Sequence, residues 1–149
     1  MSPIIPYIIL AIAAGFCLPT QAGINYRLSM WALSPVLAAA ISFAVGTVAL
    51  VVYALILRLP LPALGSVKQY PWWIWTGGFL GAFLVAATVV LAPRLGAAAM
   101  VALIVLGQMI ASVVLDHYGL IGYTIHPVNA WRIGGVLLLV GGVVLINTH

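Results

Sequence analysis

The sequence is nearly devoid of charge. Of its 149 residues only five are Lys or Arg and one is an acid, and glutamate is absent. A soluble domain of this size carries about 25% charged residues, because its surface faces water. Hydrophobic residues make up 66% of the chain, so most of its surface must face lipid. The composition excludes an ordinary soluble domain, and the length leaves room for a single domain over residues 1–149.

Groups that carry out catalysis or bind metals are equally scarce. The single acid, Asp116, leaves no pair of carboxylates for acid–base chemistry, and the single cysteine, Cys17, leaves no disulfide or cysteine metal site. His117 and His126 flank one loop with Asp116, but without the regular spacing of metal ligands. The cations are scattered singly, so no basic patch could follow a phosphate backbone. We therefore expect no catalytic residue, no metal, no cofactor, no enzymatic activity and no nucleic-acid partner.

Long apolar segments are what the chain has in abundance. A helix needs about 20 apolar residues to cross a bilayer core of about 30 Å. Five segments qualify as transmembrane helices, over residues 4–25, 35–57, 72–92, 95–115 and 131–147. The first is open to extension towards Trp31. The pattern predicts an all-α integral membrane protein with five transmembrane helices per chain.

Turn-forming and aromatic residues separate these segments. Pro and Gly gather at residues 58–71 and 116–129, which predicts two loops, and residues 92–96 predict a tight turn that makes the third and fourth segments antiparallel. All the tryptophans fall near segment ends, where they anchor a helix at the membrane surface: Trp31, Trp72, Trp73, Trp75 and Trp131. Trp75 lies one turn inside and is also a candidate pocket residue.

The odd number of segments and the cation count bear on orientation. Five crossings place the two termini on opposite sides of the membrane, and the Lys/Arg excess sets which way the chain inserts. Three cations lie on the N-terminal side and two on the other: Arg58, Lys68 and Arg132 against Arg27 and Arg94. This narrow margin predicts insertion in both orientations. Two opposite copies would form an antiparallel homodimer of ten helices, with the symmetry of inverted-repeat transporters.

Small residues indicate where helices approach closely. In the last segment Gly134-Gly135 and Gly141-Gly142 repeat at a spacing of seven and share one face. Small residues let helix backbones approach each other in lipid. The sequence leaves open whether these glycines form a dimer contact or pack within the chain.

Polar residues at membrane depth form two stripes at steps of four. One stripe lies within the first segment and consists of Cys17, Gln21 and Asn25, with Pro19 among them. The other lies in the fourth segment or at its end and consists of Gln108, Ser112 and Asp116. Glutamine amides both donate and accept hydrogen bonds, which suits a neutral or zwitterionic solute, although they could equally bond to neighbouring helices. The solute-binding candidates are Gln21, Asn25 and Gln108, with Ser42 and Trp75 as secondary ones. Asp116 could pair with Arg132 across the loop or carry a proton.

Several short blocks, taken in order over nearly the whole chain, resemble a known family. They are Pro19-x-Gln21-x3-Asn25, Ser34-Pro35, Ser42-Phe43-x2-Gly46-Thr47, Pro71-Trp72-Trp73-x-Trp75, Pro93-Arg94-Leu95-Gly96, Gly107-Gln108 and Asp116-His117-Tyr118-Gly119. The chain resembles the five-helix YdcZ-like family, once catalogued as domain of unknown function 606, of the drug/metabolite transporter superfamily. The resemblance implies a multi-pass protein of the bacterial inner membrane. It also implies dual-topology homodimers, pairs of oppositely oriented chains, or fused ten-helix forms.

Small multidrug resistance proteins are distant relatives that use a first-helix glutamate to exchange protons for cations. This chain has no glutamate, so it is not expected to export cationic drugs by that mechanism. The paired glycines of the last segment are similar to the dimer contact of those relatives.

The resulting hypothesis is a secondary transporter or exporter of a small metabolite or drug-like solute, working by alternating access as a dual-topology dimer in the lipid bilayer. Its partner is a second copy of itself or an oppositely oriented homologue. The alternative is a non-transporting scaffold or accessory subunit of a larger membrane complex, whose polar stripes would face neighbouring helices.

Overall fold

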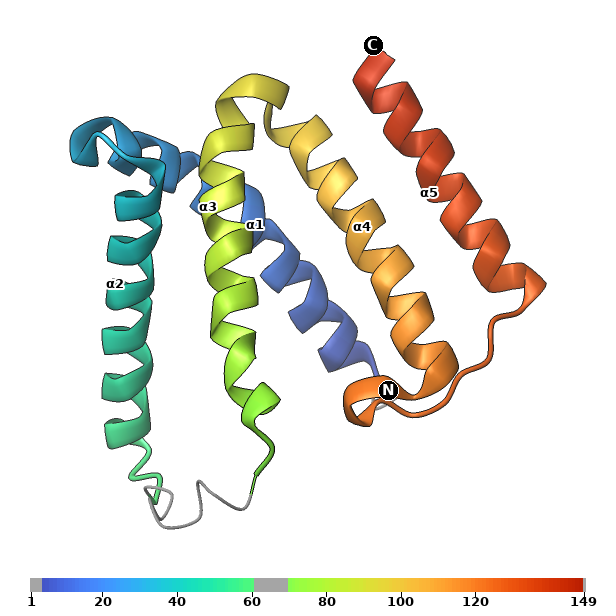
Figure 1. Ribbon diagram of the computed structural model, residues 1–149, viewed down its shortest axis with the longest axis horizontal. Coiled ribbons are helices and arrows are strands. Elements are labelled where there is room, and N and C mark those ends of the chain that lie inside the picture. Colours follow the sequence, from blue (N-terminus) through green and yellow to red (C-terminus); the bar gives the residue numbers. More distant parts are fainter. Residues whose placement is uncertain (1–3, 61–69, 149) are drawn as a thin grey trace. The chain divides into compact units, whose positions relative to one another are not determined.

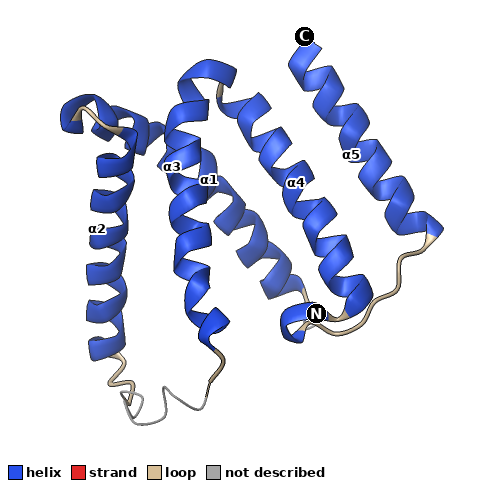
Figure 2. Ribbon diagram, in the orientation of Figure 1, coloured by secondary structure: helices blue, strands red, loops and turns tan. Residues whose placement is uncertain are grey.

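The computed structural model describes residues 4–60 and 70–148, and these residues form five long helices. They are α1 (Ile5–Ala32), α2 (Pro35–Ile56), α3 (Gly77–Leu95), α4 (Ala97–Tyr118) and α5 (Ala130–Thr148), shown in Figure 1. Two short 3-10 helices, η2 (Trp72–Thr76) and η3 (Leu120–Gly122), complete the secondary structure, and the described part of the chain contains no strand (Figure 2). With η2 counted as the start of α3, the five helices are all long and apolar enough to cross a membrane. The prediction of an all-α protein with five transmembrane helices is confirmed; the dimer stays a prediction.

Helix ends differ from the sequence prediction where polar residues continue a helix. The first helix ends at Ala32, which agrees with the extension towards Trp31 that the sequence left open, and the fourth ends at Tyr118 rather than Leu115. Apolar character marks only the part of a helix within lipid, whereas backbone hydrogen bonding continues into the polar interface. At 1.5 Å per residue α1 extends about 42 Å, which exceeds the bilayer core of about 30 Å.

The predicted turn over residues 92–96 is shorter than expected. Helix α3 continues through Pro93 and Arg94, and only Gly96, with φ of +78°, separates it from α4. A proline's φ is itself helical, but Pro93 gives up one backbone hydrogen bond and its ring crowds the carbonyl four residues earlier, and α3 ends two residues later. The loop predicted over residues 58–71 has Arg58–Pro60 and Tyr70–Pro71 outside any helix. Its other members, including Pro62, Gly65 and Lys68, lie outside the described residues.

The chain divides into two compact units, residues 1–19 with 95–149 and residues 20–94. The division falls at Pro19 within α1, and the single domain expected from length stays a prediction. In the second unit a short link joins α1 to α2: Leu33 has a positive φ, and the Ser34 hydroxyl caps α2 by accepting from Leu37 N at 3.3 Å. Gly81 of α3 faces the ring of Phe43 of α2, where an added Cβ would lie 3.3 Å from Cζ.

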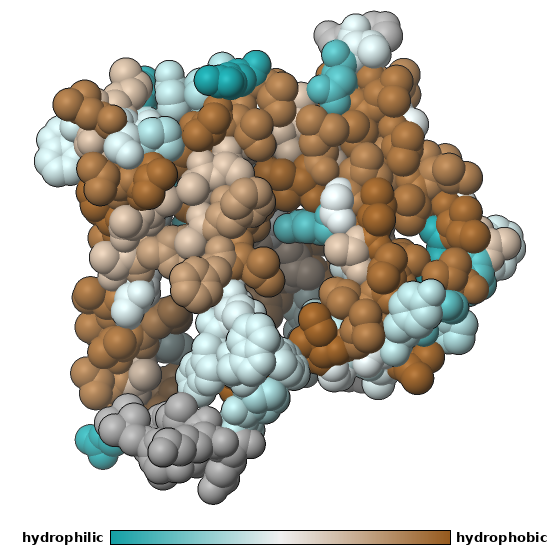
Figure 3. Space-filling view, in the orientation of Figure 1, coloured by the Kyte–Doolittle hydropathy of each residue, from teal (hydrophilic) through white to brown (hydrophobic). Residues whose placement is uncertain are grey.

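The first unit contains the α4–α5 hairpin. Helix α4 packs along α5, and the two run side by side in opposite directions (Figure 1). Met100 of α4 and Val143 of α5 are buried. Most other apolar side chains are exposed, for example Leu138 at 79%, and apolar residues dominate the visible surface of α5 in Figure 3. An apolar exposed surface is what a helix facing lipid presents.

Candidate functional site

The chain's single acid forms an ion pair between α4 and α5. Asp116 lies in the last turn of α4, and Arg132 lies near the start of α5. The guanidinium Nη2 donates to Asp116 Oδ2 at 2.8 Å, and the side chains of Asp116 and Arg132 are 25% and 31% exposed. The other terminal nitrogen, Nη1, donates to the carbonyl of His126 at 3.0 Å. One side chain thus joins both helices and the loop between them.

Backbone contacts hold the same loop in place. Gly119 caps the end of α4 in the left-handed conformation, and an added Cβ there would meet Ile125 Cγ1 at 2.6 Å, so only glycine fits. His126 N donates to the Asp116 carbonyl at 2.9 Å, and Val128 N donates to His117 Nδ1 at 3.1 Å. A ring nitrogen that accepts this bond carries no hydrogen, so the neutral imidazole has its hydrogen on Nε2. The loop is fixed from both helices.

We expect Asp116→Asn and Arg132→Gln each to lower the stability of the hairpin, because each leaves a half-buried charge without its partner. The double variant should lose less than the sum of the two, with a coupling of about 1 kcal/mol for a pair that water still reaches. Thermal unfolding of the purified variants in detergent measures this cycle. Additive losses would show that the pair contributes nothing to stability.

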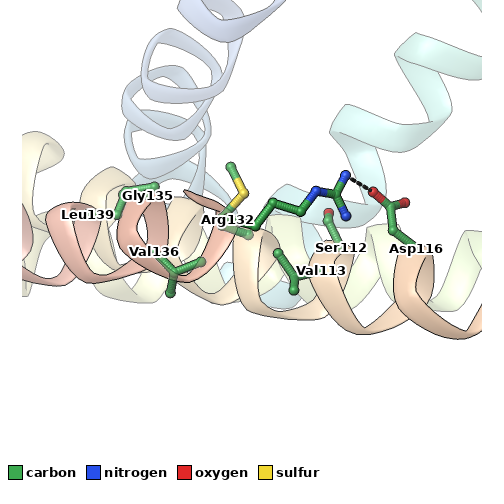
Figure 4. A pocket seen from close by; sticks show the side chains of 8 residues that line it. Ser112, Val113, Asp116, Arg132, Gly135, Val136 and Leu139 are labelled. Carbon is green, nitrogen blue, oxygen red and sulfur yellow. Dashed lines mark hydrogen bonds and ion pairs between the residues drawn. The ribbon is translucent and has the colours of Figure 1, made fainter. Parts of the chain in front are cut away.

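A cavity of about 310 Å³ lies beside the ion pair, between α4 and α5. Its lining is Met109, Ser112, Val113 and Asp116 from α4 and Arg132, Gly135, Val136 and Leu139 from α5. Figure 4 shows the guanidinium of Arg132 reaching Asp116, with Ser112 close to the pair. The charged groups therefore lie at one end of a cavity whose other walls are mainly apolar.

The cavity was not predicted, although its signal is visible in the sequence. The four lining residues of each helix follow the spacing i, i+3, i+4, i+7, which defines one helical face. The two faces become one site only when α4 and α5 are known to be neighbours. Of the predicted site residues, the cavity brings together Asp116, Arg132 and Gly135, with Ser112 from the second polar stripe.

Two polar residues of the first stripe, Gln21 and Asn25, lie in the unit of residues 20–94 and differ sharply in burial, whereas Cys17 lies in the other unit. Asn25 is only 2% exposed, and its amide nitrogen Nδ2 has no hydrogen-bond partner among the described residues. Gln21 is exposed and makes no hydrogen bond to a described residue of that unit. Ser42 is half-buried, and Trp75 is 56% exposed on η2. Asn25 is therefore the one buried polar group among these candidates.

Gln108 lies on α4, one turn before Ser112. Its side chain is exposed and makes no hydrogen bond to a described residue of its own unit. A primary amide in contact with lipid would lose the hydrogen bonds that water gives it, which costs roughly 1–3 kcal/mol by mutational measures.

The paired glycines of α5 face an open groove. A groove of about 840 Å³ runs along the helix and is lined by Gly134, Gly135, Gly141 and Gly142 together with Trp131, Leu137, Leu138 and Leu145. A Cβ added at any of the four glycines would meet nothing within 4 Å. No described residue therefore occupies the position that a Cβ would take at these glycines.

Metal-ligating side chains do not gather in residues 4–60 and 70–148: no three His, Cys, Asp or Glu lie together. Cys17 is a free thiol whose Sγ lies 3.6 Å from the carbonyl of Ala13, one turn earlier.

Comparison with known families identifies the chain. Residues 6–145 match the model of the family described as "Putative inner membrane exporter, YdcZ". The chain belongs to this YdcZ exporter family. The match covers nearly all of the sequence, including the polar stripes, the α4–α5 cavity and the glycine face. No curated protein and no solved structure matches the chain.

Membership in the YdcZ family places the five-helix chain in the inner membrane and among transporters rather than enzymes. The resemblance noted from the sequence blocks is thereby confirmed. The family description names neither a solute nor an oligomeric state.

Proposed function

We propose that the chain is a secondary transporter that exports a small neutral or zwitterionic solute. It works by alternating access as a homodimer of two copies inserted in opposite orientations. Membership in an exporter family supports transport. Five membrane-crossing helices support the opposite orientations, because an odd number gives each copy the topology of one half of an inverted repeat.

The observation that carries the transport proposal is the unpaired amide of Asn25. A buried donor left without a partner costs about 1–3 kcal/mol, so most buried polar groups in proteins are paired. In a chain whose membrane-crossing helices are almost wholly apolar, such a group persists when function requires it. We assign it to solute contact, or to a pairing made in the other state of the transport cycle.

Four further residues are proposed, each by itself, as contacts for the solute. Gln21 and Gln108 offer amides that their own units leave unpaired. Ser42 supplies a half-buried hydroxyl, and Trp75 an exposed aromatic face. All the polar groups are neutral, which suits a solute without net charge.

The groove on α5 supports the dimer. It is lined by the four paired glycines, and no described residue of the chain occupies the space that their missing side chains leave. Glycine faces of this kind allow two helix backbones to pack closely in lipid, where van der Waals contact rather than the hydrophobic effect drives association. We assign the groove to the corresponding face of a second copy.

Insertion in both orientations gives a direct prediction. In a Cys17→Ala background, a single cysteine at Leu59 should react with a membrane-impermeant maleimide from either side of intact inner-membrane vesicles. Leu59 follows the end of α2 and is 56% exposed, so it is accessible to the reagent. Right-side-out and inside-out vesicles should each label a comparable fraction of the chains.

A charge variant provides the control for this experiment. Adding a lysine on the N-terminal side of the membrane, as Leu57→Lys, should confine labelling of Leu59→Cys to the cytoplasmic side, because Lys and Arg are retained there. Labelling of the parent from one side only would contradict the homodimer, leaving an oppositely inserted homologue as the partner.

A further inference from the structure

The Asp116–Arg132 ion pair leaves much of its hydrogen-bonding capacity unused. A guanidinium has five N–H donors, and a carboxylate accepts at two oxygens. Arg132 donates from Nη2 to Asp116 Oδ2 and from Nη1 to the His126 carbonyl. The other N–H groups of Arg132 and the Oδ1 atom of Asp116 have no partner among the described residues. The pair is therefore held by a single contact, where arginine and carboxylate often form two.

A third polar group lies beside the pair and is also unpaired. The Ser112 hydroxyl makes no hydrogen bond to a described residue. Helix hydroxyls elsewhere in the chain donate to the carbonyl three residues earlier, at 2.7 Å for Ser29 and 2.8 Å for Thr88. Ser112 lies next to Asp116 and Arg132 at the polar end of the cavity (Figure 4).

The rest of the cavity suits an apolar group. Its volume of about 310 Å³ lies at the lower end of the range for small-molecule pockets, roughly 300–1,000 Å³. The lining beyond the polar end consists of apolar side chains and one glycine: Met109, Val113, Gly135, Val136 and Leu139. A small molecule with a polar head and a short apolar chain would fill this shape.

We propose that this cavity binds a small zwitterion that carries an ammonium group, an anionic oxygen group and an apolar chain. The anionic group accepts from the free N–H groups of Arg132, and the ammonium donates to Asp116 Oδ1 and to the Ser112 hydroxyl. The apolar chain of the ligand lies between Val113 and Val136. A ligand with only one charge is disfavoured, because the residue of the same sign lies within the same ion pair.

Two sources could supply this chemistry: a free amino acid with an aliphatic side chain, and the head of phosphatidylethanolamine. Both carry an ammonium group with N–H donors beside an anionic oxygen group. Phosphatidylcholine has a quaternary ammonium without N–H donors and is the matched control lipid. Binding at this cavity does not require that the chain transports anything, so the inference stands apart from the proposed function.

The test uses the full chain in phosphatidylcholine nanodiscs. Tritiated L-leucine should bind saturably, whereas 4-methylpentanoate and 3-methylbutylamine, each with only one of its charged groups, should compete at least about tenfold more weakly, equivalent to about 1.4 kcal/mol. Native mass spectrometry of protein from mixed-lipid nanodiscs should separately show whether phosphatidylethanolamine is retained over phosphatidylcholine.

Variants locate the binding. Ser112→Ala should weaken it, and Val136→Phe should abolish it by filling the cavity while leaving the ion pair in place. Arg27→Gln, which removes an exposed cation of the other unit, should bind like the parent. Leucine binding identifies a free zwitterion, and selective retention of phosphatidylethanolamine identifies the lipid. Absence of both, or binding that Val136→Phe leaves unchanged, overturns the proposal.

Discussion

Replacing Asn25 with leucine should strongly reduce export and leave the folded protein at least as stable as the parent. Asn25 is 2% exposed, and its Nδ2 has no hydrogen-bond partner in residues 4–60 and 70–148. Leucine has the same number of side-chain heavy atoms with the same branching at Cγ and no polar group, so it removes the cost of the unpaired amide, about 1–3 kcal/mol, which offsets the strain of its larger methyl groups. The same substitution removes the hydrogen bond to the solute, and flux should fall at least about tenfold if that bond contributes about 1.4 kcal/mol or more.

The measurement combines thermal unfolding with counterflow into proteoliposomes. A panel of labelled neutral and zwitterionic solutes is first tested on the parent chain, and the solutes that it transports are then used for the variants. Asn147→Leu is the matched control, because Asn147 Nδ2 already donates to the Val143 carbonyl at 2.9 Å. That variant should transport normally and gain no stability. Parental flux in Asn25→Leu, and in Gln21→Ala and Gln108→Ala, would remove the site assignment and favour a non-transporting scaffold.

Gly141→Leu should separate the dimer into monomers. The added side chain meets nothing within 4 Å of its Cβ in the chain itself, so the protomer accommodates it. The same side chain would project into the groove assigned to the second copy. Loss of close backbone packing over such a face should weaken association at least about tenfold.

Mass photometry of the purified protein in detergent follows the dimer, and counterflow follows its consequence for transport. Gly15→Leu is the control, since Gly15 also has open space around its Cβ but lies on α1. We expect that variant to remain dimeric. A dimer that survives both Gly134→Leu and Gly141→Leu would place the interface on another face.

Much of the fold follows from apolar length. A run such as residues 35–57 has few alternatives to a membrane-crossing helix, because every backbone polar group within lipid must be hydrogen-bonded internally. Helix ends were less predictable. The stop at Gly96 depends on a single left-handed residue, and Pro93 proved compatible with the helix that it was expected to end.

The candidate sites were predictable to different degrees. The ion pair could be anticipated, because Asp116 is the single acid of the sequence and Arg132 lies just after the loop that follows it. The sequence did not predict that Asn25 is buried while Gln21 is exposed, because both residues belong to one stripe at steps of four. Periodicity defines a face but not what covers it. Whether either residue contacts solute stays a prediction.

By itself, the sequence determined the class of this protein: five membrane-crossing helices, almost no charge, and a match to the YdcZ exporter family over residues 6–145. These properties depend on transfer of each segment from water to lipid, which is additive along the chain. Only the tertiary structure decided that Asn25 is buried with an unpaired amide, and that Asp116, Arg132 and Ser112 surround one end of a cavity. Such features depend on which helix faces meet, and no single segment contains that information.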